Sequence, residues 1–176
     1  MTGHAPHPAS NAAAALGLLS SLASYRTARQ ELLETMGLGR SNRDPLAEVA
    51  EHLALALWEG RLAESRVQAR YDLVSADGAF VQVKYLANPL DSWPNEHCVR
   101  SIPGVAWYTL VVYEAFEVTG VLAFPPDLAE ICRALGKRHP EQSTSLQFTR
   151  RNWWTIRDDV ETYRQLGMRV WLPPFL

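Results

Sequence analysis

The sequence predicts an α/β domain with a central mixed β-sheet flanked by helices, and three observations favour this fold class. The chain has 176 residues with 47% hydrophobic content, which is enough for one core. Stretches with helical apolar spacing alternate with short runs of strand-forming residues. Two of these runs, around residues 70–85, are joined by an Asp-Gly turn. We expect a flexible tail over residues 1–14 and a single domain over residues 15–176.

Local start and stop signals place the individual elements. A long amphipathic helix is expected over Ala14–Met36, and Asp44-Pro45 begins a second helix as N-cap and first helical residue. The segment Ala87–Ile102 contains two prolines and little periodicity, which predicts a loop beside the presumed site. The later elements are strands over residues 105–114, 118–124, 146–149 and 168–172, and helices over residues 125–135 and 157–166.

The hairpin around residues 70–85 is predicted to bring three polar side chains together. A three-residue loop closed by Gly78 places Asp72 opposite Gln82. Side chains alternate along a strand, so Gln82 and Lys84 share a face, and opposed Cβ atoms lie about 4.5–5.5 Å apart. A two-residue turn would instead place Val83 opposite Asp72 and separate the three. The same pattern also fits the solvated face of a half-buried sheet.

The second predicted helix supplies two acidic candidates. Glu51 lies one turn before Leu55 and is expected to be half-buried, where a carboxylate needs a cation or a hydrogen-bond donor. Glu48 points further from the apolar stripe, and a surface glutamate paired with an arginine is the favoured interpretation there. The stripe that defines these positions consists of Leu46, Val49, Ala50, Leu53 and Leu57.

The run from Ala50-Glu51 to Leu57, followed by Tyr71-Asp72 through Val81-Gln82-Val83-Lys84, resembles the core of the PD-(D/E)XK nuclease superfamily. It is most similar to the Mrr-like branch, where glutamine replaces the second acidic residue and gives Asp…Gln-X-Lys. Tyr71 stands where the superfamily motif has proline. The resemblance implies a restriction endonuclease-like fold with Asp72 as central metal ligand and the Gln82 carbonyl oxygen as a second ligand. It also implies that Lys84 lies near the attacking water and scissile phosphate, and that Glu51 is the helical carboxylate of the site.

The implied activity is that of a Mg²⁺-dependent DNA endonuclease, which hydrolyses phosphodiester bonds by direct in-line attack of water. Oxygen ligands such as Asp72 and Glu51 suit Mg²⁺, and we expect Mn²⁺ to substitute for it. Glu48 is a further candidate metal ligand. Lys84 would orient the water or neutralise charge on the phosphate.

Global charge gives no support for nucleic-acid binding, because the net charge is −2 and the isoelectric point is about 6.2. Local arginines are therefore the candidate nucleic-acid contacts, although each also fits an ordinary solvated surface: Arg66, Arg70, Arg150 and Arg151. The adjacent Trp153 and Trp154 favour burial in a core over base stacking. The predicted loop adds four candidate substrate contacts, which fit a structural loop equally well: Asp91, Asn95, Glu96 and His97.

Cysteine usage and hydropathy favour a cytoplasmic protein. Cys98 and Cys132 lack metal-ligand spacing and are expected to be reduced, and no apolar run is long enough to span a membrane. The expected partners are double-stranded DNA, a second copy in a homodimer that cuts both strands, and a partner subunit or methyltransferase of a restriction-modification or other defence system. The alternative is a non-catalytic DNA-binding or protein-interaction module on the same fold, within a defence or repair complex.

Overall fold

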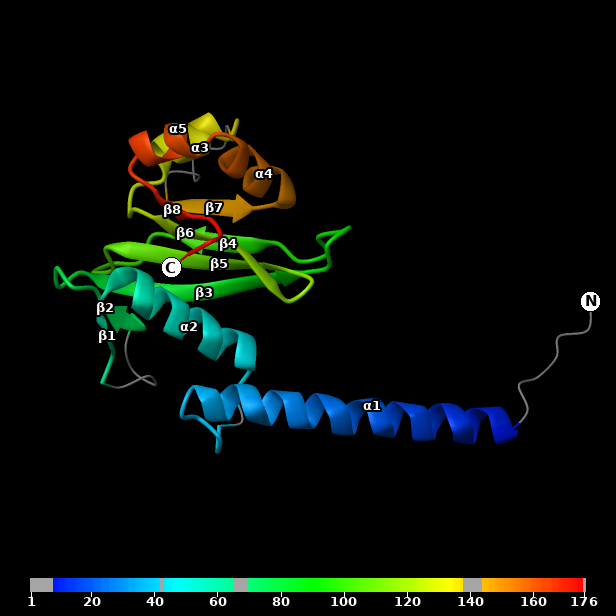
Figure 1. Ribbon diagram of the computed structural model, residues 1–176. Coiled ribbons are helices and arrows are strands. Elements are labelled where there is room, and N and C mark those ends of the chain that lie inside the picture. The colour runs from blue at the N-terminus through cyan, green and yellow to red at the C-terminus, as the bar shows by residue number, and fades with distance from the viewer. Residues whose placement is uncertain (1–7, 42, 65–69, 138–143, 176) are drawn as a thin grey trace, which may run out of the picture. The chain divides into compact units, whose positions relative to one another are not determined.

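A computed structural model describes residues 8–41, 43–64, 70–137 and 144–175, with the backbone alone described for residues 8–14 (Figure 1). The chain divides into two compact units, Met1–Pro45 and Leu46–Leu176. Helix α1 (Pro8–Thr35) belongs to the first unit and begins earlier than the predicted Ala14. It ends where Gly37 adopts φ +72° and Leu38 N donates to Leu33 O at 2.7 Å, a pattern that caps the last turn. Within the described residues, no helix combines the length and hydropathy needed to cross a bilayer.

The larger unit is built on a six-stranded sheet with the strand order β1-β2-β3-β5-β6-β8. Strands β3 and β5 are parallel and all other neighbours are antiparallel, so the sheet is mixed as predicted. A separate antiparallel pair is formed by β4 and β7. The strands are β1 (Arg61–Leu62), β2 (Leu73–Val74), β3 (Phe80–Asn88), β4 (His97–Arg100), β5 (Trp107–Glu114), β6 (Glu117–Phe124), β7 (Ser145–Phe148) and β8 (Arg169–Trp171).

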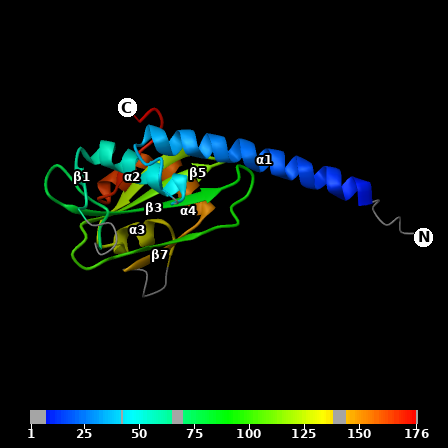
Figure 2. The same cartoon turned by 90° about the horizontal axis from the view of Figure 1, so that it is seen from below.

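Helices cover both faces of this sheet, which confirms the predicted α/β architecture (Figures 1 and 2). One face packs on α2 (Pro45–Trp58), where Ala50, Ala54 and Trp58 lie in one hydrophobic cluster with Val81 and Val83. The other face bears Leu86, Leu110 and Leu122 and is covered by the β4–β7 pair and three helices. These helices are α3 (Ala129–Ala134), α4 (Arg150–Asp158) and α5 (Val160–Gln165).

The predicted register of the first hairpin is confirmed. Leu73 pairs with Val81 and Val74 with Phe80, and Ser75 N donates to Ala79 O at 2.9 Å. Gly78 has φ +86°, a left-handed conformation that glycine adopts at little cost. The backbone pairing ends at Leu73 and Val81, and Asp72, the residue before Leu73, donates its backbone N–H to Val81 O at 2.9 Å.

Two predictions about the chain beyond β3 were wrong. The segment Ala87–Ile102 is not wholly a loop, because it contains β4, which pairs with β7 near the other end of the chain. It also connects the parallel strands β3 and β5, a position that usually holds a helix. The helix predicted over residues 157–166 is instead two helices, α4 and α5, and α4 begins at Arg150 after the N-cap Thr149.

Candidate functional site

Asp72, Gln82 and Lys84 converge at the start of β3. One carboxylate oxygen, Asp72 Oδ2, accepts hydrogen bonds from Gln82 Nε2 and, at 2.7 Å, from the backbone N–H of Val83. Lys84 Nζ lies 4.0 Å from the same oxygen. The Asp72 side chain is 19% exposed and that of Lys84 is 48% exposed, so the carboxylate is sheltered while the ammonium group faces solvent.

The local sequence explains why Asp72 holds this position. Strand β2 has only two residues, so its backbone ladder with β3 stops before Val83. The Asp72 carboxylate accepts the N–H of Val83, which a longer strand would have satisfied with a backbone carbonyl. Asp72 therefore closes the end of the hairpin in addition to presenting a charge.

The orientation of Gln82 differs from the predicted one. The resemblance implies that the carbonyl oxygen of Gln82 faces a metal, but in this structure its Nε2 donates to Asp72. The same Nε2 lies 3.4 Å from the Val83 carbonyl oxygen. Two oxygens therefore converge on the partly positive NH₂ group of the side-chain amide.

The structure does not bring the two glutamates of α2 to the face that carries Gln82 and Lys84. Side chains alternate along β3, and α2 packs on the face that bears Val81 and Val83. Gln82 and Lys84 point to the opposite face. Both glutamates are more buried than predicted: Glu51 is 6% exposed, and Glu48 is fully buried at 0% instead of lying at the surface.

Two further residues lie next to the site: Tyr108, which sequence reasoning did not assign to it, and His97, one of the candidate contacts of the predicted loop. Tyr108 is the Cα partner of Gln82 across the parallel β3–β5 pair, and its hydroxyl lies 2.7 Å from His97 Nε2 of β4. Burial, and then the nearby charges of Cys98 and Asp72, raise the pKa of Tyr108 to about 12, so its hydroxyl stays protonated at neutral pH. A tyrosine on a buried strand carries no sequence signal of such a role, and His97 had only its place in the loop to suggest it.

The predicted arginine and tryptophan contacts have mixed outcomes. Arg150 donates to the carbonyl oxygens of Leu90 and Asp91 at 2.9 and 3.0 Å and lies over the Trp154 ring, so it fixes the loop after β3. Trp153 is fully buried, as favoured. Arg70 and Arg151 are exposed, while Arg66 lies outside the described residues.

The loop residues have structural roles of their own. Asn95 exchanges hydrogen bonds with Asn88, its backbone N–H donating to Asn88 Oδ1 at 2.9 Å and its carbonyl oxygen accepting from Asn88 Nδ2 at 3.1 Å. Glu96 accepts a hydrogen bond from Gln147 of β7. Of the four predicted loop contacts, His97 is the one that these hydrogen bonds connect to the Gln82 side of the sheet.

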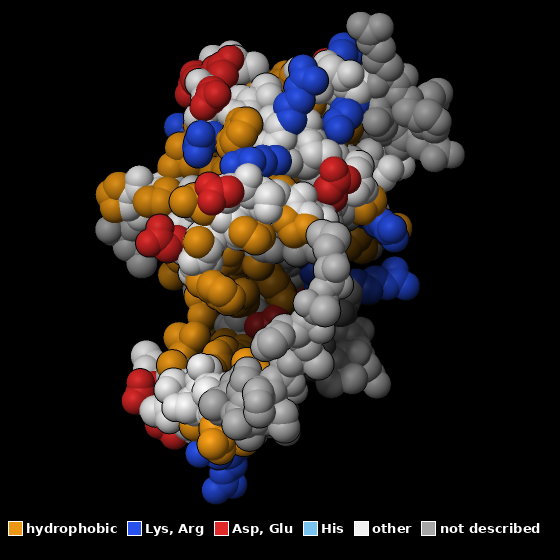
Figure 3. Space-filling model, turned by 90° about the vertical axis from the view of Figure 1, so that its right-hand side faces the viewer, with side chains coloured by type: hydrophobic (Ala, Val, Ile, Leu, Met, Phe, Trp, Pro, Cys, Tyr) orange, Lys and Arg blue, Asp and Glu red, His pale blue; other side chains and the backbone are white. Residues whose placement is uncertain are grey.

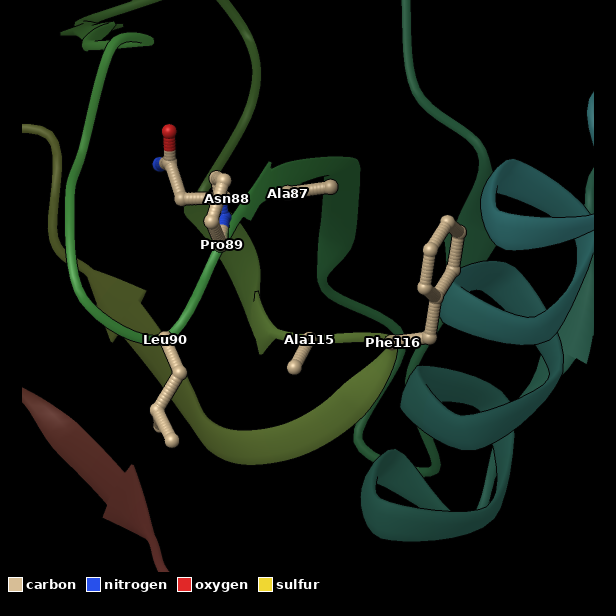
Figure 4. A pocket seen from close by; sticks show the side chains of 6 residues that line it. All are labelled: Ala87, Asn88, Pro89, Leu90, Ala115 and Phe116. Atoms are coloured by element: carbon tan, nitrogen blue, oxygen red, sulfur yellow. The ribbon is translucent and has the colours of Figure 1, made fainter.

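An apolar pocket lies at the other end of β3, away from Gln82 and Lys84 (Figure 4). Its volume is about 410 Å³, and Ala87, Asn88, Pro89, Leu90, Ala115 and Phe116 line it. Ala115 and Phe116 form the β5–β6 turn with φ of +49° and +67°, and Phe116 is 80% exposed. Such φ angles cost energy in residues other than glycine and asparagine. The Phe116 ring of this strained turn faces solvent.

Charge on the surface is mixed on the face shown in Figure 3. Among the described side chains coloured there, lysines and arginines are interspersed with acidic and hydrophobic groups and form no continuous basic field. On this face, a nucleic-acid contact would therefore depend on a few local cations rather than on a broad basic surface.

The oxygen atoms near the hairpin are of the chemical type that binds hard divalent cations. Among the described residues, no group of three His, Cys, Asp or Glu side chains has the arrangement of a metal site. The set at the hairpin is mixed instead, with one carboxylate, one side-chain amide and the Val83 carbonyl oxygen. A half-turn about the Gln82 Cγ–Cδ bond would put its Oε1 where Nε2 now lies. These hard oxygens suit Mg²⁺, which binds through one or two carboxylates and keeps several waters.

Comparison with known proteins leaves this geometry as the main source of inference. No protein-family model matches the chain, and a search of curated proteins finds no match.

Proposed function

We propose that the protein is a metal-dependent endonuclease that hydrolyses phosphodiester bonds in DNA, with a restriction endonuclease-like arrangement of helix, hairpin and strand. The observation that carries this proposal is the convergence of Asp72, Gln82 and Lys84 on one side of the β2–β3 hairpin. The order of helix α2, the β2–β3 hairpin and strand β3 supports it, because this is the order that the sequence resemblance implies. The resemblance further implies a role in restriction or genome defence.

The chemistry divides among the three side chains. Asp72 and the Gln82 and Val83 carbonyl oxygens would hold the cation, Mg²⁺ or Mn²⁺, which when bound supplies charge compensation for the phosphate and a more acidic water. Lys84 is half-exposed, and its Nζ lies 4.0 Å from the Asp72 carboxylate. We therefore assign Lys84 to the non-bridging oxygens of the scissile phosphate, as an electrostatic stabiliser rather than a base.

The test uses conservative variants and a matched lysine. Asp72→Asn keeps an oxygen that accepts the Val83 N–H but removes the charge, and Lys84→Gln removes the ammonium group. We expect each variant to lose about 10²-fold or more of plasmid cleavage in Mg²⁺ or Mn²⁺. Lys137, the other lysine of the chain, is partly exposed and donates to Gln147 O, and Lys137→Gln should cleave like wild type. Equal cleavage by wild type, Asp72→Asn and Lys84→Gln would assign the activity to a contaminant.

A second candidate function is a non-catalytic protein-interaction module, and the exposed ring of Phe116 beside an apolar pocket favours it. The pocket is lined by uncharged side chains, which suits an apolar partner segment and not a phosphate. This candidate predicts no cleavage by purified wild-type protein in either metal, so the same assay separates the two functions.

A further inference from the structure

An aromatic pair lies next to Asp72 at the start of β3. The rings of Tyr71 and Phe80 are stacked, with their centroids 4.1 Å apart and their planes 6° from parallel. Tyr71 directly precedes Asp72 in the chain, and Phe80 is the first residue of β3. Phe80 is 40% exposed, although large aromatic side chains are mostly buried. The stack therefore reaches solvent beside the candidate site.

The alternation of side chains along β3 places this pair on the face that carries the candidate site. Phe80 shares that face with Gln82 and Lys84, because the three residues are two apart along the strand. Two steps along a strand cover about 7 Å. Gln82 in turn donates a hydrogen bond to the Asp72 carboxylate. The stacked rings are therefore immediate neighbours of the oxygens that we assign to the cation.

An exposed arginine lies in the same row of the sheet as Phe80. Val74 pairs with Phe80 across β2 and β3, and with Arg61 across β1 and β2. Residues directly opposite each other in antiparallel strands carry their side chains on one face, so Arg61 shares the face of Phe80. Two strand spacings, about 10 Å, separate them. Exposed cations therefore flank the rings in two directions, Arg61 across the sheet and Lys84 along β3.

A nucleotide of unpaired DNA matches this arrangement of groups. Its base is a flat ring that stacks on aromatic side chains, and its phosphates are anions that arginine and lysine bind. In a duplex the bases stack on one another, so a base must be unpaired or leave the helix before a side chain can stack on it. An apolar protein segment would cover the rings but would leave Arg61 and Lys84 without a counter-charge. The observations therefore favour a nucleotide as the occupant.

We propose that Tyr71 and Phe80 form a stacking platform for an unpaired base of the DNA strand that is cut beside Asp72, with Arg61 as a phosphate contact. This inference rests on the proposed nuclease function and names its substrate class, which is DNA with unpaired nucleotides next to the scissile phosphate. Every base has a face that can stack, so the platform selects unpaired DNA rather than a sequence.

Binding is measured apart from cleavage, by fluorescence polarisation with the full chain in EDTA. One labelled probe is a short single-stranded thymidine oligonucleotide. The other has the same length and consists of abasic tetrahydrofuran residues, so it carries the same phosphates without bases. We expect wild type to bind the thymidine probe roughly tenfold more tightly than the abasic probe, because stacking on aromatic side chains contributes to binding base by base.

The variants separate stacking from charge. Phe80→Leu and Tyr71→Leu each remove one ring and should bind the two probes with nearly equal affinity. Tyr71→Phe keeps the ring and should keep the wild-type preference. Arg61→Gln should weaken binding of both probes to the same extent, and reduce the slope of log K against log salt by about 0.7, the value for one phosphate of a single strand.

The matched control is Tyr25→Leu, which makes the same substitution as Tyr71→Leu at a ring of α1 that is 58% exposed. It should keep the wild-type preference. Equal binding of the two probes by wild type, or an unchanged preference in both Phe80→Leu and Tyr71→Leu, would overturn the platform even if wild type cleaves DNA. A preference lost in these variants and kept in Tyr25→Leu, with no cleavage by wild type, would support the platform and remove the nuclease proposal. Wild type that binds neither probe would also overturn the platform.

Discussion

At the scale of single residues, Asp72 combines a structural and a chemical role. Its carboxylate closes the end of the β2–β3 ladder through Val83 and also lies next to Lys84. The pairing of Asp72 with Gln82 could be predicted because a short loop with glycine in the left-handed position fixes the register. The direction of the Gln82 amide could not be predicted, since both orientations satisfy the same alternation. In this structure the neighbouring carboxylate decides it.

The Gln82 amide gives a prediction about stability and metal binding. Gln82→Glu replaces a donor to Asp72 with a second carboxylate, so two like charges would face each other. Without a divalent cation we expect the free energy of unfolding to fall by about 1–3 kcal/mol. Added Mg²⁺ should restore that loss and raise the melting temperature more than in wild type.

Thermal denaturation with EDTA and with Mg²⁺ measures both effects of Gln82→Glu. The control is Gln147→Glu on β7, where the side chain is exposed and its partner is Glu96. A Gln82→Glu protein as stable as wild type in EDTA and unaffected by Mg²⁺ would show that the oxygens do not form a cation site.

At the scale of elements, local signals and long-range pairing had different predictive value. The turn at Gly78 and the Asp44-Pro45 helix start are local, and both were found where predicted. Strand β4 was missed because its partner β7 is distant in sequence and its own segment contains Pro89 and Pro94.

Strand β6 and helix α4 are in close contact at one glycine. A Cβ added to Gly120 would lie 2.3 Å from Cη2 of Trp153, a side chain that is fully buried. We expect Gly120→Ala to lower the free energy of unfolding by about 1–3 kcal/mol, because a large ring in a packed core has little room to move. Chemical denaturation measures this change.

The control for Gly120→Ala is Gly17→Ala in α1, where an added Cβ would meet nothing within 4 Å. That substitution should be neutral or stabilising by up to about 1 kcal/mol, since alanine is the better helix former. Equal stability of Gly120→Ala and wild type would mean that Trp153 does not pack on β6 as described.

At the scale of the whole molecule, the chain offers one Asp72–Gln82–Lys84 cluster, whereas a double-strand break needs two cutting events. We expect a single chain to nick supercoiled DNA and a symmetric pair of chains to linearise it. Because the net charge is −2, the proposed DNA substrate would be held by local cations rather than by long-range attraction.

The stoichiometry of cutting can be measured by mixing chains. Adding Asp72→Asn protein to wild type should suppress linear product while nicked circles persist, because mixed pairs would hold one working site. Gel analysis over a protein concentration series follows both products, and light scattering gives the oligomeric state. If light scattering shows a monomer and this monomer converts supercoiled DNA to linear product in one step, the expectation that two chains cut together would be contradicted.

The connection between β3 and β5 contains β4, and this bears on which residues of the protein can vary. Because β4 lies within this connection, its side chains are carried by a segment that belongs to neither parallel strand. The hydrogen bond between Asn95 and Asn88 holds one end of the segment, and pairing with β7 holds its middle. Changes at the exposed positions of this segment should leave the six-stranded sheet intact, whereas Val99 and Ile102 belong to the core packing and should tolerate less change. If the proposed nuclease function holds, changes at those exposed positions would alter the preferred nucleic acid without changing the residues around Asp72.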